Sequence, residues 1–320
     1  MARRPEIGYK LCSEEQSPRE LVDCARRAEE TGFDFAMISD HYHPWVDRQG
    51  QSSFVWAVLG ALSGATERMK IGTAVTCPTI RIHPAIIAQA AATVAAMMPG
   101  RFILGVGSGE NLNEHIFGDH WPEIDVRHEM LEEAVEVIRL LWQGGQQSHR
   151  GNHYTVENAR VYTLPDEPPP IIVAAGGPQA AKVAGRIGDG LVATAPNKEL
   201  TREFEKAGGK GKPRYAEMAV CWAKNEAEAR RTAHEYWPTV ALSGELSQVL
   251  PVPAHFEQAT KLVKEEDVAK EVICGPDPER HLAEIREYAE AGFDHVWVHQ
   301  IGPDQEGFFR FYEKEILPKL

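Results

Sequence analysis

The stretch FILGVGSGENLNE, from Phe102 to Glu114, joins an apolar run to a loop of glycines and polar side chains. Its first six residues carry no polar side chain, which is typical of a parallel strand that is covered on both faces. The GSG that follows suits a tight passage from a strand into a helix. The stretch therefore predicts one strand of a parallel sheet, with polar groups gathered at its carboxyl end.

The same pattern of a short apolar run followed by an amphipathic stretch recurs on both sides of this segment. Further strands are expected at 7–12, 35–40, 69–75, 171–176, 190–195, 218–223 and 295–300. Helices are expected at 18–30, 54–66, 84–98, 129–142, 178–186, 278–291 and 307–317. A polar crossing occupies 144–170, and an insertion, helical over 226–270 and strand-like over 271–275, precedes the last strand.

Alternation of strands and helices indicates a parallel sheet, which is either open or closed. Eight such units fit a closed barrel better than an open sheet. The predicted fold class is therefore α/β, a (β/α)₈ TIM barrel with a helical insertion at about 226–276 between strands 7 and 8. We expect a single domain over residues 1–320, because barrels of this length fold as one unit.

The composition is that of an ordinary globular protein, with 43% hydrophobic and 25% charged residues in a chain of 320. The net charge of −13 disfavours binding to nucleic acid or to an anionic membrane. The longest apolar stretch, 86–98, is too short to span a bilayer. No apolar segment follows the arginines of MARRPEIGYK, and the five cysteines form no CxxC pair. We therefore expect reduced thiols and a cytoplasmic location.

The residues just past the expected strands are rich in polar side chains and glycine, as a barrel mouth requires. They are Ser13-Glu14-Glu15, SDHYHPW at 39–45, GSGENLNE at 107–114, AAGGP at 174–178 and TAPN at 194–197. GSG and AGG expose backbone N–H groups beside helix starts, which suits an anion.

Each of these pieces also has an ordinary structural explanation. The glycines can form a simple turn, Asp40 can cap a helix before a solvent-exposed His41, and Glu110 can favour the first turn of a helix. GVGSGE is not a dinucleotide fingerprint, because its third glycine position holds Glu110. The histidines show no metal-ligand spacing, so no metal site is expected. No GxSxG elbow and no P-loop is present in the sequence.

Taken together, the histidine, the indole and two carboxylates at one mouth suit hydride chemistry on a hydroxyl group. A base must take the O–H proton while a planar cofactor takes hydride from the same carbon. An indole N–H can hold the oxygen on which charge develops.

At these residues the sequence resembles a known family. SDHYHPW, GTAV with CPT at 72–79, HPAIIAQA, LGVGSGENLNE and AAGGPQAAKVAGRIGDG are similar to the luciferase-like oxidoreductases that use coenzyme F420, in the glucose-6-phosphate dehydrogenase-like branch. The resemblance runs nearly end to end. It implies a TIM barrel, a homodimer, a small-molecule substrate and F420 at the carboxyl-terminal mouth.

The resemblance also implies roles for individual residues. His41 would be the general base, Trp45 would steady the substrate oxygen, Glu110 would deliver a proton to the deazaflavin, and Glu14 would share their pocket. A non-proline cis peptide would join Ala74 to Val75 in a bulge under the cofactor. The other positions that match cofactor contacts are Asp40, Cys77, Gly107, Ser108, Gly109, Asn113, Ala175, Gly176 and Gly177. Thr194 matches a threonine on the substrate side.

The sequence departs from the sugar-phosphate members where they carry cations. They have a lysine after the sixth strand, where this sequence has only Lys198, shifted by one position. They have another lysine in the insertion, where residues 243–253 of this sequence contain neither lysine nor arginine. Glu271 occupies the position of an arginine in the sugar-phosphate members. Cys77 occupies the position of a threonine that contacts the cofactor in relatives. Because a phosphate needs converging cations, the expected substrate is an alcohol or sugar and not a sugar phosphate.

Three alternatives stay open at this point. The first is an FMN-dependent luciferase-like monooxygenase on the same barrel. The second is an F420-dependent glucose-6-phosphate dehydrogenase whose phosphate pocket is rebuilt, with Lys261 or Lys264 supplying a cation. The third is an F420-binding protein without catalysis, which retention of His41 and Glu110 disfavours.

Overall fold

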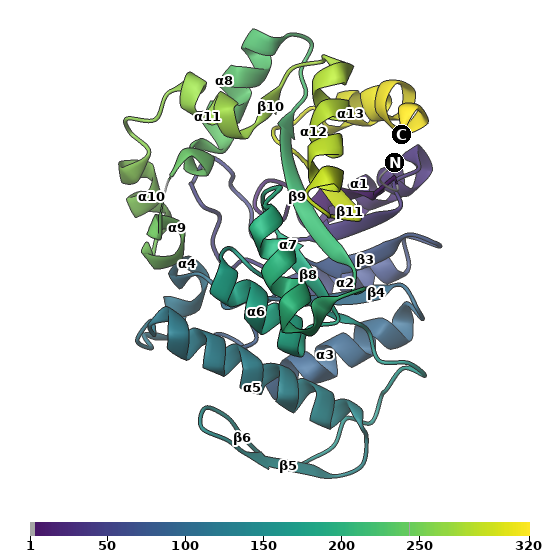
Figure 1. The fold of residues 1–320 in the computed structure, drawn as a ribbon, viewed down its shortest axis with the longest axis vertical. Coiled ribbons are helices and arrows are strands. Elements are labelled where there is room, and N and C mark those ends of the chain that lie inside the picture. The colour runs from purple at the N-terminus through teal and green to yellow at the C-terminus, as the bar shows by residue number, and fades with distance from the viewer. Residues whose placement is uncertain (1–3, 243) are drawn as a thin grey trace.

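A computed structural model describes residues 4–242 and 244–320 and contains a closed parallel barrel (Figure 1). Its eight strands are β1 (Glu6–Leu11), β2 (Phe35–Ile38), β3 (Lys70–Thr73), β4 (Phe102–Val106), β7 (Ile171–Ala174), β8 (Gly190–Ala193), β9 (Arg214–Cys221) and β11 (His295–Gln300). They pair in the order β9-β11-β1-β2-β3-β4-β7-β8, and a β8–β9 pairing closes the ring. The predicted TIM barrel is confirmed.

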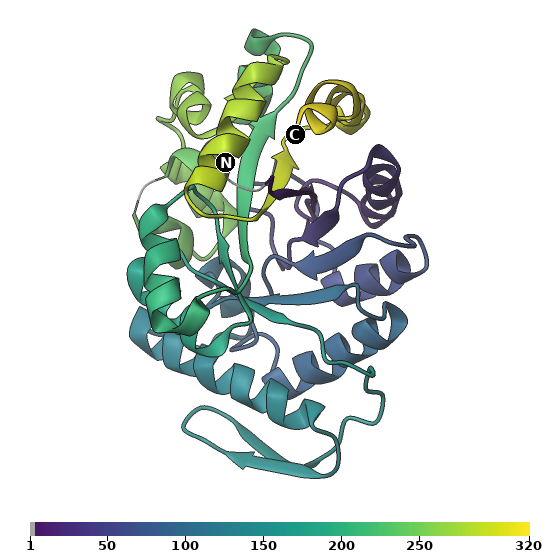
Figure 2. The same ribbon diagram turned by 45° about the vertical axis from the view of Figure 1, so that its right-hand side comes forward.

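Helices surround the strands as an outer ring (Figure 2). They are α1 (Pro18–Thr31), α2 (Val55–Ser63), α3 (Pro84–Met97), α5 (Ile124–Trp142), α6 (Pro178–Ile187), α7 (Lys198–Phe204), α12 (Pro278–Glu290) and α13 (Gln305–Phe311), while the short α4 (Asn111–Glu114) lies in the loop after β4. α1 shows how the sequence sets their limits. Ser17 and Glu20 form a capping box at its start, and Gly32, with φ 97°, ends it in the left-handed region.

The insertion lies between β9 and β11, as expected, and gathers on one side of the barrel (Figure 1). It consists of α8 (Glu226–Tyr236), α9 (Leu246–Val249), α10 (Pro253–Ala259), α11 (Glu265–Glu271) and the short β10 (Ile273–Cys274). β10 pairs with the carboxyl end of β9 at Val220 and Cys221. Ser243, which begins the segment without lysine or arginine, lies outside the described residues.

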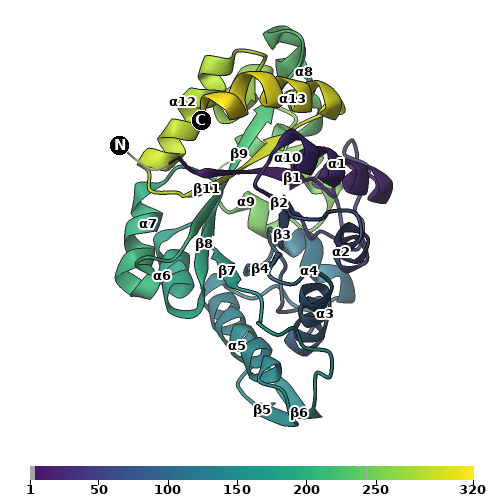
Figure 3. The same ribbon diagram turned by 90° about the vertical axis from the view of Figure 1, so that its right-hand side faces the viewer.

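Several element limits differ from the prediction. The crossing at 144–170 contains a hairpin of β5 (Gln147–Arg150) and β6 (Thr155–Ala159), which lies outside α5 (Figure 3). Its strands are short and polar, so hydrophobic periodicity does not reveal them; the carboxylate of Glu133 holds the turn by accepting backbone N–H groups of 152–154. α5 begins five residues earlier than expected, β9 begins at Arg214 instead of 218, and α7 was not predicted.

The barrel interior changes character along its axis. Nearer the amino ends of the strands it is apolar, filled by Phe35, Met37, Ile103, Ile172, Val192, Tyr215 and Trp297. Toward the carboxyl ends come the buried side chains of Lys10 and His299 and the half-buried Glu217. This polar layer is the floor of the barrel mouth. No helix in the described parts of the chain has the length and hydrophobicity to cross a bilayer.

Candidate active site

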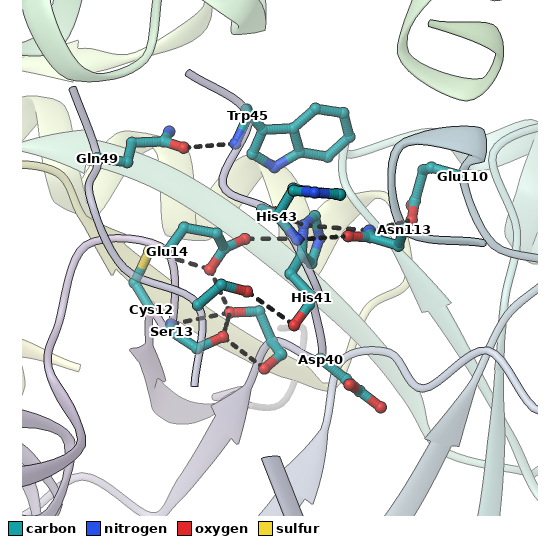
Figure 4. A network of polar contacts seen from close by, with 12 residues as sticks. Cys12, Ser13, Glu14, Asp40, His41, His43, Trp45, Gln49, Glu110 and Asn113 are labelled. Atoms are coloured by element: carbon teal, nitrogen blue, oxygen red, sulfur yellow. Dashed lines mark hydrogen bonds and ion pairs between the residues drawn. The ribbon is translucent and has the colours of Figure 1, made fainter. Parts of the chain in front are cut away.

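The loops after β1, β2 and β4 bring predicted site residues together at one mouth. In the close-up view, Glu14, His41, Asn113 and Glu110 follow one another across the site, with Trp45 above them (Figure 4). Their loops are neighbours because β1, β2, β3 and β4 are consecutive in the barrel. The structure therefore groups the four residues expected to be catalytic with one expected to bind the cofactor.

Glu14 is a buried, ionised carboxylate beside the ring of His41. It accepts a hydrogen bond from the Ser39 hydroxyl, and its Oε1 lies 3.6 Å from His41 Nε2. Burial by itself raises the pKa of Glu14, but the charges of His41 and Lys10 and the Ser39 hydrogen bond outweigh it and lower the pKa to about 2. Glu14 therefore offers a fixed negative charge that stabilises a protonated His41.

Asn113 fixes the other side of the His41 ring. Its Oδ1 accepts the backbone N–H groups of Tyr42 and His43, at 2.9 and 3.2 Å, which orients the amide. Its Nδ2 consequently faces His41 Nδ1 at 3.2 Å and Glu110 Oε2 at 3.4 Å. Asn113 is 2% exposed, so this bridge between the expected base and the expected acid is held rigidly.

The backbone carbonyl of His43 lies 3.1 Å from His41 Nδ1. Because the Asn113 amide nitrogen can only donate and the carbonyl can only accept, Nδ1 bonds to one or the other according to the tautomer. In the tautomer with the proton on Nδ1, this proton is donated to the carbonyl and Nε2 is able to accept one. Nε2 is the nitrogen that faces Glu14. In that tautomer His41 has a ring nitrogen free to take up a proton, as the expected role of general base requires.

Trp45 forms part of an apolar wall above His41. The two rings lie 5.2 Å apart, and the indole packs edge-on against Phe256 of α10 at 5.2 Å. Phe256, Val46 and Leu112 form the buried part of this wall, while Leu242 and Leu250 are partly exposed like Trp45, so the barrel and the insertion both contribute to it. The indole nitrogen has no hydrogen-bond partner among the described residues, which leaves it available to a substrate oxygen.

Asp40 has a structural role that the sequence did not reveal. Its carboxylate accepts from Arg81 at 2.9 Å and from the Thr76 hydroxyl at 2.8 Å. Arg81, which was not predicted as a site residue, also lies 3.5 Å from Glu114. Asp40 thus connects the loop after β2 to the loop after β3 by hydrogen bonds. Both carboxylate oxygens of Asp40 already accept from protein groups.

The bulge after β3 matches the expectation. The Ala74–Val75 peptide bond is cis. β3 ends at Thr73, two residues before the predicted limit. A side chain at Gly107 would stand 2.7 Å from Val75 Cγ2, and one at Gly109, with φ 78°, would stand 2.5 Å from Cys77 Sγ. The GSG loop is therefore packed tightly on the bulge, with Ser108 between the two glycines.

The second glycine loop is open. A side chain at Gly176 or Gly177 would meet no atom within 4 Å. Gly177 is the N-cap of α6 and supplies no side-chain cap, while Ala175 N–H is bonded to Val192. Open space beside a helix start without a side-chain cap fits the anionic part of a cofactor.

Two predicted substrate residues do not join the His41 cluster in this structure. Thr194 is exposed just past β8. Lys198 begins α7 and lines a groove with Arg286, Glu287 and Glu290 of α12, another helix of the outer ring. Glu271, at the end of α11, is exposed.

Comparison with known proteins places this geometry in a family. The family model described as luciferase-like monooxygenase matches residues 4–295. The F420-dependent glucose-6-phosphate dehydrogenase of Kribbella flavida is 40% identical over 327 residues, covering 98% of each chain. An F420-dependent secondary alcohol dehydrogenase in complex with an F420-acetone adduct superposes with a TM-score of 0.91 at 30% identity, covering 98% of each chain. The coenzyme F420-dependent tetrahydromethanopterin reductase of Methanopyrus kandleri superposes with a TM-score of 0.80 at 25% sequence identity, covering 99% of each chain.

These similarities confirm the resemblance that the strand-end motifs predicted. The family match covers most of the chain, and the solved relatives share its barrel fold over nearly the whole length. The chain belongs to the luciferase-like monooxygenase family.

Proposed function

We propose that this protein is an F420-dependent dehydrogenase that transfers hydride between the CH–OH group of an alcohol and the deazaflavin. The observation that carries the proposal is the placing of His41 between Glu14 and Asn113, under the free indole N–H of Trp45. A base, a charge that stabilises its protonated form and an oxygen-binding donor are the groups that alcohol oxidation requires.

The residues of the mouth fit F420. The cis bulge at Ala74–Val75 and the GSG loop packed on it would hold the deazaflavin, and the open loop at Gly176 and Gly177 would hold the anionic part. When bound, F420 supplies a planar ring that accepts or returns hydride. Relatives named for F420 dependence, at 36–40% identity over almost the whole chain, support this choice.

The protein's own part in the reaction is proton handling. His41 Nε2 accepts the hydroxyl proton of the substrate while Nδ1–H donates to the carbonyl of His43. The imidazolium that results is stabilised by the ionised Glu14, 3.6 Å away. Glu110, held by Asn113, is placed to manage a second proton on the cofactor side.

We propose an apolar, unphosphorylated alcohol as the substrate. The wall beside Trp45 consists of Phe256 and aliphatic side chains. Lys10 is paired with Glu217, Arg81 is paired with Asp40, and Lys198 lines an outer groove. These three cations are therefore not free to bind a phosphate at the mouth.

Glucose 6-phosphate is a second candidate substrate, because the curated relatives are named for it. One buried cation supports it: Arg127 in the first turn of α5 is 4% exposed and has no carboxylate partner within the described parts of the chain. It donates to Gln248 Oε1 of the insertion at 2.9 Å. A rebuilt phosphate pocket would use this residue.

Steady-state kinetics distinguish the two substrates. The protein with F420 is offered 2-propanol, cyclohexanol, glucose and glucose 6-phosphate, and the loss of deazaflavin absorbance is followed. We expect kcat/KM for cyclohexanol to exceed that for glucose 6-phosphate at least about 100-fold, because two missing charge-assisted bonds cost about 1.5–3 kcal/mol each. Preference for the phosphate ester, lost in Arg127→Gln and kept in Lys198→Ala, would establish the second candidate instead.

Failure of every alcohol and sugar to reduce F420 would exclude both substrates and leave the FMN-dependent monooxygenase as the alternative. Homodimer formation and a cytoplasmic location stay predictions from the resemblance.

A further inference from the structure

Below the mouth, a thiol, a carboxylate and an imidazole converge although they come from opposite ends of the chain. Cys12 and Glu15 follow β1, and His299 lies near the end of β11. The sulfur of Cys12, a carboxylate oxygen of Glu15 and a ring nitrogen of His299 all lie within 4.8 Å of one another. Cys12 and His299 are each 1% exposed. Their separation in sequence explains why ligand spacing predicted no metal site.

We infer that Cys12, Glu15 and His299 form a binding site for Zn²⁺. Glu15 Oε1 lies 3.8 Å from Cys12 Sγ and 3.5 Å from His299 Nε2. Tetrahedral zinc with bonds of about 2.0–2.3 Å has ligand-to-ligand distances of about 3.3–3.8 Å. Both distances to Glu15 therefore fit a zinc site, and the Cys12 sulfur and the His299 nitrogen lie within 4.8 Å of each other.

The nitrogen of His299 that faces the cluster lacks a hydrogen-bond partner. His299 Nε2 is fully buried and makes no hydrogen bond within the described chain. His299 Nε2 lies 3.5 Å from Glu15 Oε1, close enough for an ion pair when the ring is protonated but without hydrogen-bond geometry. A buried ring nitrogen without a partner is costly, so it indicates a group that is absent from the protein atoms themselves.

The groups around the cluster orient it as a metal site requires. The other ring nitrogen of His299 lies 3.4 Å from Glu217, and a carboxylate in this position fixes the ring and raises the basicity of a ligating nitrogen. Glu15 accepts from the Trp237 indole and from Gly302 N–H at 2.9 Å. Two of the three ligands are thus held in place by contacts outside the cluster.

The charge of this region favours a cation. Three carboxylates, those of Glu14, Glu15 and Glu217, surround one lysine, Lys10. A divalent ion would supply the missing positive charge, and so would a doubly protonated His299 between Glu15 and Glu217. The two states differ at Cys12. With a bound metal ion Cys12 is a thiolate ligand, and with a doubly protonated His299 it is a neutral thiol. Thiolate, imidazole and carboxylate together favour zinc over magnesium or calcium.

Cobalt substitution tests the site without cofactor or substrate, so its result is independent of the proposed function. Metal-free full-length protein is titrated with Co²⁺ and, in competition with a chelating indicator, with Zn²⁺. We expect one equivalent of Co²⁺ with a thiolate-to-cobalt charge-transfer band in the near ultraviolet. The band should vanish in Cys12→Ser, and Zn²⁺ affinity should fall at least about 100-fold in His299→Asn.

Cys274→Ser is the matched control, because Cys274 is equally buried and lies outside the cluster. It should keep both the band and the Zn²⁺ affinity. Circular dichroism melts of each variant check that the fold is retained. Absence of a stoichiometric ion, or a band that persists in Cys12→Ser, would overturn the site and leave His299 as an imidazolium between two carboxylates.

Discussion

His41 is the residue on which the proposed chemistry depends. Replacement by alanine removes the proton acceptor but leaves the glycine loops that would hold the cofactor. We expect His41→Ala to lower kcat for alcohol oxidation by about 10²- to 10⁴-fold, the usual contribution of a positioned base. F420 affinity, measured by fluorescence titration, should stay within about threefold.

The matched control is His115→Ala, whose ring lies nearby but is bonded to Asn111 O. It should retain most of the activity. If His41→Ala kept more than a third of wild-type turnover, the proton would have to leave through another group, with Glu14 the nearest.

Asn113 should act as a positioning residue for His41 and Glu110. Loss of its amide removes the bridge at 3.2 and 3.4 Å and leaves the backbone N–H groups of Tyr42 and His43 without their acceptor. We expect Asn113→Ala to lower kcat by about 10- to 100-fold, since bonds to charged groups contribute about 1.5–3 kcal/mol. KM for the alcohol should change little.

Asn111→Ala is the control on the same short helix, because the Asn111 side chain bonds to Val249 O at 2.9 Å and, within the described residues, to no group of the His41 cluster. Equal losses in the two variants would show that α4 is disturbed as a whole and that the bridge has no separate role.

At residue scale, the sequence identified which side chains meet but not how they are held. Glu14, His41, Trp45, Glu110 and Asn113 could be predicted because each follows a recognisable strand. Arg81 could not, because it lies several residues past β3, and only the fold shows that its charge is used by Asp40 and Glu114. The charge of Lys10 is likewise absorbed by Glu217 inside the barrel.

At the scale of elements, α4 presents Asn113 to the site and Glu114 to the interior. Burial raises the pKa of Glu114 to about 7, although its contacts with Arg81 oppose the shift. In the unfolded chain this carboxyl titrates near its ordinary pKa of about 4.3. The folded state therefore binds the proton more tightly, and the stability that Glu114 contributes is complete below about pH 4 and is lost as the pH rises to 7.

Glu114→Gln should abolish this loss of stability at rising pH, because glutamine does not titrate. The variant keeps a side-chain oxygen that accepts from the backbone N–H of Arg81. We expect the free energy of unfolding of the variant, relative to wild type, to rise between pH 4 and pH 8 by about 3 kcal/mol. Urea unfolding across this pH range measures the difference. A difference that stays constant with pH would mean that Glu114 is ionised in the folded protein throughout.

Elements with strong hydrophobic patterns were predictable and those without were not. The strands of the barrel are mainly apolar, so each was found within a few residues. The hairpin of β5 and β6 depends on a tertiary contact, the Glu133 carboxylate, and its residues show no period of two. β3 ends at Thr73, just before the cis Ala74–Val75 bond, and only the family resemblance indicated that bond.

At the scale of the whole molecule, cofactor binding should stabilise the barrel because the loops after two neighbouring strands would hold the ligand. The GSG loop follows β4 and the open glycine loop follows β7. A ligand present at 100 times its Kd adds about 2.7 kcal/mol to the free energy of unfolding. For 320 residues that corresponds to a rise in Tm of about 4 °C. F420 should produce this shift, and FMN at the same concentration should not.

Gly177→Ala separates binding from folding in the same measurement. Gly177 has an extended backbone with φ −152°, and an added methyl group would meet no protein atom within 4 Å. The Tm of the variant without ligand should therefore equal that of wild type, while the methyl group would occupy the space that we assign to the anionic part of F420. We expect the F420-induced rise in Tm to shrink or disappear at the same ligand concentration. An unchanged rise would place the anionic part of the cofactor away from this loop, and a larger shift with FMN than with F420 would contradict the proposed cofactor itself.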